Sequence, residues 1–398
     1  MGAMTTTIEG IQGEVAPGFE PVREAFAANF ERHDDIGAAV CVYHRGRPVV
    51  DLWAGTADPD TGRPWTRDTL QLVYSATKGA TATAAHLLVQ RGELDLDAPV
   101  AEYWPEFAAH GKERIPVRQL LSHRAGLPAL DHPVPLADAL TWHPMVAALA
   151  AQRPAWTPGT AHGYHGRTYG WLVGEVIRRV SGRTPGRYFA DEIAGPLGLD
   201  FFIGLPDGER PRVSRMAYRQ PTVDFSTVPP EAIPEEYRAA VAAMLDPDSL
   251  SNRAFAITDP PEIDFNSPEV QAAEIPASNG LCTARGLARM YAALVGEVDG
   301  VRLLTPETVA AATSEQSSGQ DRVLMLPMRF ASGYTLPTDQ APLTGPHAFG
   351  HPGRGGSLGF ADPSHDLAFG YVMNHIVEDP TDARAASLVK AVGRSLAG

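Results

Sequence analysis

Lysine is scarce in this chain, whose 33 basic residues are almost all arginines. Lysine occurs only at Lys78, Lys112 and Lys390. The formal net charge of −14 argues against nucleic acid and anionic membranes as partners, because both require a basic surface. No hydrophobic run approaches the length of a transmembrane helix, although hydrophobic residues make up 44% of the chain. The composition therefore predicts a globular protein with an ample core and no membrane partner.

Cysteine is almost absent as well. Cys41 and Cys282 lie far apart and lack the spacing of metal ligands, so we expect two reduced packing residues and no disulfide framework. The N-terminus has neither a basic region nor an apolar stretch, so no secretory signal is predicted. These absences predict a cytoplasmic protein without a metal or another cofactor. They leave its oligomeric state open.

The period of the hydrophobic pattern changes along the chain and separates β-rich from helical segments. β-rich runs are predicted at 38–44, 48–55, 330–336, 358–362 and 368–374. Helical spacing predicts the remaining elements, at 18–33, 76–91, 116–123, 166–181, 185–194, 234–245, 284–295, 305–314 and 382–396.

Strands near both ends of the chain predict one sheet that is built from both ends. We expect a discontinuous α/β domain of residues 18–75 and 276–398 around this sheet. Residues 76–275 are predicted to form a mainly helical domain with a cap or loop at about 223–268. Residues 1–17 are expected to form an extended tail.

A serine and a lysine lie three residues apart at the start of a predicted helix. Residues at this spacing share a helix face, so the amine of Lys78 is expected beside the hydroxyl of Ser75. A buried lysine loses its proton readily and can act as a base, which arginine cannot do. The spacing is not decisive by itself, because Ser387 and Lys390 repeat it in the C-terminal amphipathic helix.

A serine nucleophile also needs a proton partner and donors for an oxyanion. Tyr164 lies in a loop just before a predicted helix, from which a phenol can point into a cleft. Residues 349–360 form a glycine-dense turn that runs into a strand, and such glycines allow backbone N–H groups to approach a substrate. Both elements are candidate partners of Ser75.

Together these elements resemble the serine β-lactamase and DD-peptidase superfamily, in particular class C β-lactamases and family VIII carboxylesterases. Residues 75–78 match the Ser-x-x-Lys box, and residues 164–166 lie where the family has Tyr-x-Asn. Residues 351–353 lie where it has Lys-Thr-Gly or His-x-Gly. Residues 120–128 look like the family element Leu-Leu-x-His-x-x-Gly-Leu, and residues 158–160 like its Pro-Gly-x lead-in. The resemblance covers nearly the whole chain, with the motifs in the family's order.

The resemblance implies an α+β fold of the β-lactamase/transpeptidase-like type. In this fold an antiparallel sheet flanked by helices packs beside a mainly helical lobe, and the active site lies between them. By the same resemblance Ser75 attacks an acyl carbon, Lys78 and Tyr164 exchange its proton, and the N–H groups of Ser75 and Arg354 form the oxyanion hole. The residues implied to contact the substrate are His351, Gly353, Gly166 and His165.

Two departures from the family pattern bear on the substrate. Gly166 replaces the usual asparagine, which removes the side-chain amide that would hold a peptide or lactam carbonyl. His351 replaces the usual lysine and is expected to be largely neutral at pH 7, which removes a fixed cation. Both losses favour an uncharged small-molecule ester over β-lactams and peptides, and we expect a carboxylesterase that cleaves esters with a short acyl chain.

Other functions stay open at this point. Acyl transfer to an alcohol, β-lactam hydrolysis and D-amino-acid peptide hydrolysis would use the same triad, and a ligand-binding relative without turnover is a further alternative. Ser357 lies in a Gly-x-Ser-x-Gly pattern, but Pro363 follows too early for the helix that a nucleophile elbow requires. His162 and His165 lack the clustered carboxylates of a metal hydrolase.

Overall fold

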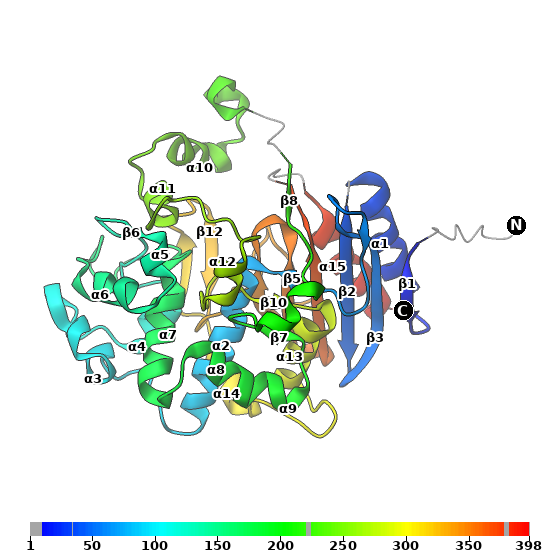
Figure 1. Ribbon diagram of the computed structural model, residues 1–398, viewed down its shortest axis with the longest axis horizontal. Helices are drawn as coiled ribbons and strands as arrows, with labels where there is room; N and C mark the ends of the chain where they lie inside the picture. The colour runs from blue at the N-terminus through cyan, green and yellow to red at the C-terminus, as the bar shows by residue number, and fades with distance from the viewer. Residues whose placement is uncertain (1–9, 34, 220–223, 378–381, 398) are drawn as a thin grey trace, which may run out of the picture.

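Strands from both ends of the chain form one antiparallel sheet (Figure 1). The computed structural model describes residues 10–33, 35–219, 224–377 and 382–397. The strand order is β1-β3-β2-β15-β14-β13, and β4 pairs with β3. The strands of this sheet are β1 (Gln12–Val15), β2 (Gly37–His44), β3 (Arg47–Asp58), β4 (Arg63–Pro64), β13 (Phe349–Pro352), β14 (Leu358–Asp362) and β15 (Leu367–Met373).

The centre of the sheet joins the N-terminal hairpin to the C-terminal strands. β2 pairs with β15 so that Val42 faces Phe369, and every residue of β15 is buried. Helix α13 (Ala284–Val295) packs against β2, β14 and β15. Gly370 allows this close approach, because a Cβ there would collide with the carbonyl of Ala284. Helices α1 (Glu20–Arg32) and α15 (Arg384–Ala397) pack against each other.

Helix α2 (Thr77–Gln90) runs between the sheet and a group of helices. It contacts α7 (Thr168–Ser181), α8 (Pro185–Phe189) and β13, and it is buried from Thr77 to Leu88. Gly92, with a φ of +70°, provides the left-handed residue that is typical after a helix end. The other helices of this part are α3 (Val100–Tyr103), η2 (Pro105–Gly111), α4 (Val117–Leu121), α5 (Leu136–Ala139), α6 (His143–Ala151), η3 (Ala190–Ala194) and α9 (Gly195–Leu197).

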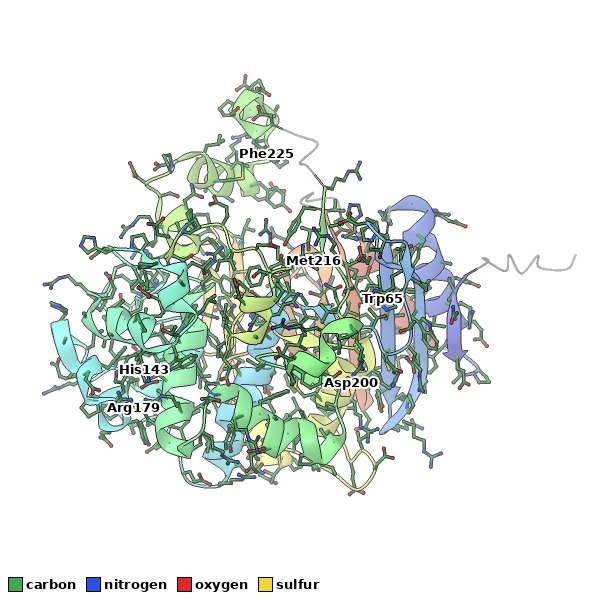
Figure 2. The ribbon with its side chains drawn as sticks, in the orientation of Figure 1. Trp65, His143, Arg179, Asp200, Met216 and Phe225 are labelled. Atoms are coloured by element: carbon green, nitrogen blue, oxygen red, sulfur yellow. The ribbon has the colours of Figure 1, made fainter. Side chains whose placement is uncertain are left out.

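Part of the predicted cap projects from the body of the molecule (Figure 1). Helix α10 (Glu235–Leu245) has no buried residue, and Phe225 lies near the tip of the projection (Figure 2). The short elements of this region and its surroundings are η4 (Asp207–Arg212), β8 (Ala217–Tyr218), η5 (Phe225–Thr227), η6 (Pro230–Ala232), α11 (Leu250–Phe255), β9 (Thr258–Asp259) and α12 (Pro268–Ala272).

Small sheets and turns complete the fold. β5 (Gln71–Leu72), β10 (Leu281–Cys282) and β7 (Phe201–Phe202) form one small sheet, and β11 (Ser317–Gln320) pairs with β12 (Pro327–Phe330). β16 (His375–Ile376) pairs with β8, and β6 (Val134–Pro135) pairs with β9. The remaining elements are η1 (Tyr74–Ala76), α14 (Pro306–Ala312), η7 (Arg354–Gly356) and η8 (Pro363–His365).

The strand predicted at 330–336 is wrong. Phe330 is the last residue of β12, and the chain then turns through Gly333, whose φ is +89°. The predicted helix 185–194 is divided into α8 and the π-helix η3. Part of the predicted tail 1–17 belongs to the sheet as β1, while residues 1–9 lie outside the described residues.

Other features of the fold agree with the sequence or leave its predictions untested. The mixture of an antiparallel sheet with helices agrees with the α+β prediction. Cys41 and Cys282 are buried and unbonded to each other, as expected. The domain limits 18–75 with 276–398, 76–275 and 223–268 stay predictions. None of the helices within the described ranges is long and apolar enough to cross a membrane.

Candidate active site

Ser75 lies in the short turn η1, directly before α2. The chain enters this turn through Tyr74, whose φ of +44° is unusual for a residue other than glycine. The turn is fixed on both sides, because the N–H of Val73 donates to the carbonyl of Gly280 at 2.9 Å and the Thr77 hydroxyl donates to the carbonyl of Tyr74. Ser75 remains partly exposed in these buried surroundings.

Lys78 is fully buried one helical turn after Ser75. Its Nζ lies 3.0 Å from Ser75 Oγ, 2.7 Å from the carbonyl oxygen of Gly166 and 3.0 Å from that of Ala277. Burial holds the pKa of Lys78 well below its usual value. A neutral amine has two N–H groups and one lone pair. Because the two carbonyls take the two N–H groups, the lone pair is left for the hydroxyl of Ser75.

Tyr164 approaches the same hydroxyl from the loop before α7. Its phenol is hydrogen-bonded to Ser75, and its ring centre lies 4.8 Å from Lys78 Nζ. Burial raises the pKa of Tyr164 far above its usual value, so the phenol keeps its proton. The structure therefore brings the predicted residues Ser75, Lys78 and Tyr164 together, with an amine of lowered pKa and a phenol of raised pKa around one serine.

Asp321 holds the backbone of the Tyr164 loop, and no sequence pattern pointed to it. This carboxylate is fully buried, and one of its oxygens accepts the N–H groups of Tyr164 at 3.0 Å, Val323 at 2.8 Å and Leu324 at 2.8 Å. His123 supports the same loop, because its Nδ1 accepts the N–H of His165 at 3.1 Å. His123 falls within the family-like element 120–128, so the sequence contained a signal for it.

His165 is held in place by two hydrogen bonds to the backbone, and its contact with a substrate stays a prediction. It is fully buried, its Nδ1 donates to the carbonyl of Gly163 at 2.7 Å, and its Nε2 accepts the N–H of Leu127 at 2.9 Å. Burial lowers its pKa to about 3. Both ring nitrogens are thus occupied, which leaves no lone pair for a metal ion. Within the described ranges, no three His, Cys, Asp or Glu side chains gather in a way that could hold one.

The glycine-rich turn predicted for the oxyanion lies against the turn of Ser75. Gly353 allows this contact, because a Cβ there would collide with the carbonyl of Val73. Ser357 Oγ donates to the same carbonyl at 3.1 Å. Ser357 is fully buried and leads into strand β14, so it has a structural role and neither the exposure nor the following helix of a nucleophile elbow. Arg354 begins the 3-10 turn η7 between them.

A buried arginine supports this turn from behind. Arg384 Nη2 donates to the carbonyl of Gly355 at 3.0 Å, and Nη1 lies 2.6 Å from Asp35 Oδ1. Nε donates to Asp382 at 2.9 Å, and the Tyr371 hydroxyl donates to the second oxygen of Asp35 at 2.8 Å. The side chains of Arg384 and Asp35 are completely buried. The start of α15 and the segment after α1 are thus linked to the turn η7.

His351 and Gly166 differ from the lysine and asparagine that are usual in the family. The charge of the first and the space around the second agree with what these differences predicted. His351 Nδ1 donates to the carbonyl of Pro352 at 2.7 Å, and burial lowers the pKa of His351 to about 3. His351 is therefore neutral at pH 7, as predicted. A Cβ at Gly166 would lie 2.6 Å from the ring of Phe255. The phenyl ring occupies the space that a side chain at position 166 would need, while the carbonyl of Gly166 binds Lys78.

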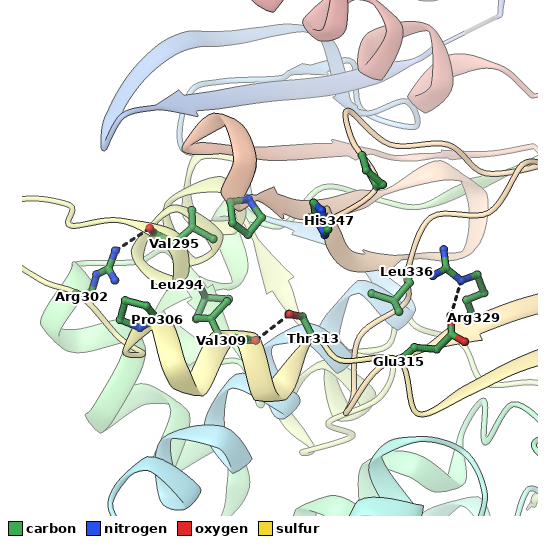
Figure 3. Close-up of a pocket in the computed structure, with 13 residues that line it drawn as sticks. Leu294, Val295, Arg302, Pro306, Val309, Thr313, Glu315, Arg329, Leu336 and His347 are labelled. Atoms are coloured by element: carbon green, nitrogen blue, oxygen red, sulfur yellow. Dashed lines mark hydrogen bonds and ion pairs between the residues drawn. The ribbon is translucent and has the colours of Figure 1, made fainter.

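A separate pocket of about 380 Å³ lies away from these residues, beside α13 and α14 (Figure 3). Leu294 and Val309 provide apolar walls, and Glu315 pairs with Arg329 at one end of the pocket at 2.7 Å. None of the predicted catalytic residues lines this pocket. The chemistry of the molecule is therefore expected at Ser75.

Comparison with known proteins agrees with this geometry. The family model described as Beta-lactamase matches residues 22–394. The chain belongs to the beta-lactamase family. It is 37% identical over 373 residues to the protein described as Esterase/beta-lactamase LipL from Mycobacterium tuberculosis strain H37Rv, an alignment that covers 92% of this chain and 83% of LipL.

Solved structures of this family resemble the chain over almost its whole length. A family VIII carboxylesterase superposes with a TM-score of 0.84 at 38% identity, covering 97% of this chain and 99% of the other. EstA from Arthrobacter nitroguajacolicus Rue61a superposes with a TM-score of 0.85 at 36% identity, covering 97% of this chain and 98% of EstA. These similarities confirm the predicted family and its β-lactamase/transpeptidase-like fold.

Proposed function

We propose that this protein is a carboxylesterase that cleaves uncharged small-molecule esters through an acyl-Ser75 intermediate. One observation carries the proposal: the buried amine of Lys78, whose pKa is lowered by burial, lies 3.0 Å from Ser75 Oγ and has two backbone carbonyls as its other hydrogen-bond partners. A base with a free lone pair at hydrogen-bond distance from a hydroxyl is what nucleophilic catalysis by serine requires. The esterases among the similar proteins support the same conclusion.

The reaction then follows from the protonation states. Ser75 Oγ attacks the acyl carbon and gives its proton to Lys78. The negative charge on the former carbonyl oxygen is stabilised by the N–H groups of Ser75 and Arg354. The phenol of Tyr164 donates a proton to the leaving alcohol, and the proton held by Lys78 restores the phenol. Water repeats the sequence on the acyl-enzyme, which releases the carboxylic acid and free Ser75.

Esters are favoured over lactams and peptides for two reasons. His351 is neutral and therefore offers no fixed cation for a substrate carboxylate. Gly166 offers no side-chain amide for a peptide or lactam carbonyl, and the ring of Phe255 fills the space above it. An ester also demands less of the proton donor, because an alcohol leaves more easily than an amine. The role of Gly353 in this scheme is to bring the oxyanion turn against the Ser75 turn.

A side-by-side assay of p-nitrophenyl esters and a chromogenic cephalosporin tests the proposal. The wild type is expected to hydrolyse the esters and to leave the cephalosporin nearly untouched, and Ser75→Ala is expected to lose on the order of a thousandfold or more in kcat. Ser387→Ala is the matched control, because Ser387 has the same spacing to a lysine but none of the partners of Ser75. Ester hydrolysis that survives in Ser75→Ala would overturn the assignment, as would efficient lactam hydrolysis with poor ester hydrolysis.

Acyl transfer is separated from hydrolysis in the same assay. Both reactions pass through the acyl-enzyme and differ only in whether water or an alcohol removes the acyl group. Adding a primary alcohol and measuring the ratio of new ester to free acid distinguishes them.

The cytoplasmic location remains a prediction from the sequence.

A further inference from the structure

A single groove gathers the exposed large apolar side chains of the described part of the chain. Tyr218, Met244, Leu245 and Phe255 are 46%, 49%, 47% and 40% exposed, and all of them line one groove of about 830 Å³. Exposed apolar side chains scattered singly are normal on a soluble protein, but a cluster marks a binding site. A volume of this size is typical of sites for organic ligands.

The groove begins at the proposed active site. Arg354, whose N–H is assigned to the oxyanion, is part of its wall, as is Arg167, the residue after Gly166. The guanidinium of Arg167 donates to the carbonyl of Pro261 at 2.8 Å and so ties the opposite wall to the start of α7. The ring of Phe255 lies over Gly166. The groove therefore extends from the neighbourhood of Arg354 and Gly166 to the end of α10.

The position of the proton donor decides which part of an ester lies in the groove. The leaving alcohol must lie within hydrogen-bond reach of the phenol of Tyr164. Neither Tyr164 nor Lys78 lines the groove. The alcohol part of the ester thus faces these two residues. The acyl chain is the other substituent of the acyl carbon, and it faces the groove.

We propose that this groove binds the acyl chain of the substrate and selects esters of medium to long apolar acids. The proposal rests on the proposed esterase function and departs from the sequence-based expectation of a short acyl chain. Phe255 and Phe265 contact the part of the chain nearest Ser75, and Met244 and Leu245 contact its far end. Burial of a methylene against such a surface favours binding. Each fully buried methylene raises kcat/KM by about fourfold.

The test is a series of p-nitrophenyl esters from acetate to decanoate, at concentrations below those at which the esters aggregate. In the wild type, kcat/KM is expected to rise by about two- to fourfold per methylene from butanoate to octanoate. In the double variant Met244→Ser/Leu245→Ser, kcat/KM for octanoate is expected to be about tenfold lower than in the wild type. The same variant is expected to hydrolyse acetate at the wild-type rate. Val241→Ser is the matched control, because it makes the same kind of change on α10 outside the groove.

Four results would overturn the proposal. A wild-type kcat/KM that is flat or falls beyond butanoate would do so, as would equal losses for acetate and octanoate in the double variant. Acetate esters of alcohols of increasing length form the second arm, and a rise confined to that series would place the alcohol in the groove. A dimer that the double variant dissociates without changing the chain-length profile would assign the groove to a second copy. Failure of the esterase function itself is recognised separately, because acetate hydrolysis would then survive in Ser75→Ala.

Discussion

Replacing Arg384 by methionine should impair both stability and catalysis, although Arg384 does not contact the reacting atoms. The change removes the hydrogen bonds of the guanidinium to Asp35, Asp382 and Gly355. The fully buried carboxylate of Asp35 keeps the hydroxyl of Tyr371 as a side-chain partner. Removing one member of a buried ion pair costs about 3–5 kcal/mol, which is a large share of the roughly 5–15 kcal/mol that holds a typical domain together.

The catalytic part of this prediction comes from the bond to Gly355. Without it, the turn that carries the N–H of Arg354 is free to move away from the position of the oxyanion. Loss of an oxyanion donor costs about 10²–10³ in kcat, so a displaced donor should cost about ten- to a hundredfold with a smaller change in KM. Urea unfolding measures the stability, and steady-state ester hydrolysis by the folded enzyme measures kcat.

Two further variants separate the two effects. Arg384→Lys keeps a cation beside Asp35 but loses the planar fork, so it should recover stability more fully than kcat. Glu175→Gln disturbs another buried ionic group, in which Glu175 binds Arg178 and Arg179 away from the oxyanion turn. It should lower stability and leave kcat unchanged. A folded Arg384→Met enzyme with wild-type kcat would refute the reasoning, because the turn would then hold its shape unaided.

Four other predictions concern the proton chemistry and the loop of Tyr164. Lys78→Met should lose about 10²–10⁴ in kcat, because the base is removed. The same variant should resist urea better than the wild type at pH 7. The reason is that a buried amine with a lowered pKa destabilises the fold at every pH below the pKa of a free lysine. In the wild type, kcat/KM should fall as the pH is lowered through the pKa of Lys78, because a protonated amine cannot accept a proton. Gly166→Asn should reduce kcat because its side chain collides with Phe255, and adding Phe255→Ala should restore it; a double-mutant cycle without coupling would contradict this. Asp321→Asn should lower kcat more than it changes KM, because the loop of Tyr164 loses the carboxylate that accepts its backbone N–H, and circular dichroism would confirm that the variant is folded.

The residues that could be predicted from the sequence are those fixed by local geometry. Ser75 and Lys78 are three residues apart at the start of α2, and this spacing predicted that their side chains lie side by side, where Nζ and Oγ are 3.0 Å apart. Tyr164 was found because it lies in a short family-like box. The strand at 330–336 was predicted wrongly, since its apolar residues match a β pattern while Gly333 turns the chain.

The supporting residues could not be found in this way because their partners are distant in sequence. Asp321 binds the N–H of a residue 157 positions earlier, and Arg384 binds Asp35 across 349 positions. Phe255 fills the space above Gly166 from a segment with no family-like motif. Such contacts depend on the closed fold, and a single sequence carries no periodic or spacing signal for them.

The sheet that joins both ends of the chain also sets the order in which the enzyme is assembled during synthesis. Ser75, Lys78 and Tyr164 leave the ribosome early, and the turn at Arg354 follows only after the cap and α13 have been made. Because α2 must pack against β13, the nascent chain carries its nucleophile and base before it can stabilise negative charge. The sheet, and with it the turn at Arg354, is therefore complete only after β15 has paired with β2.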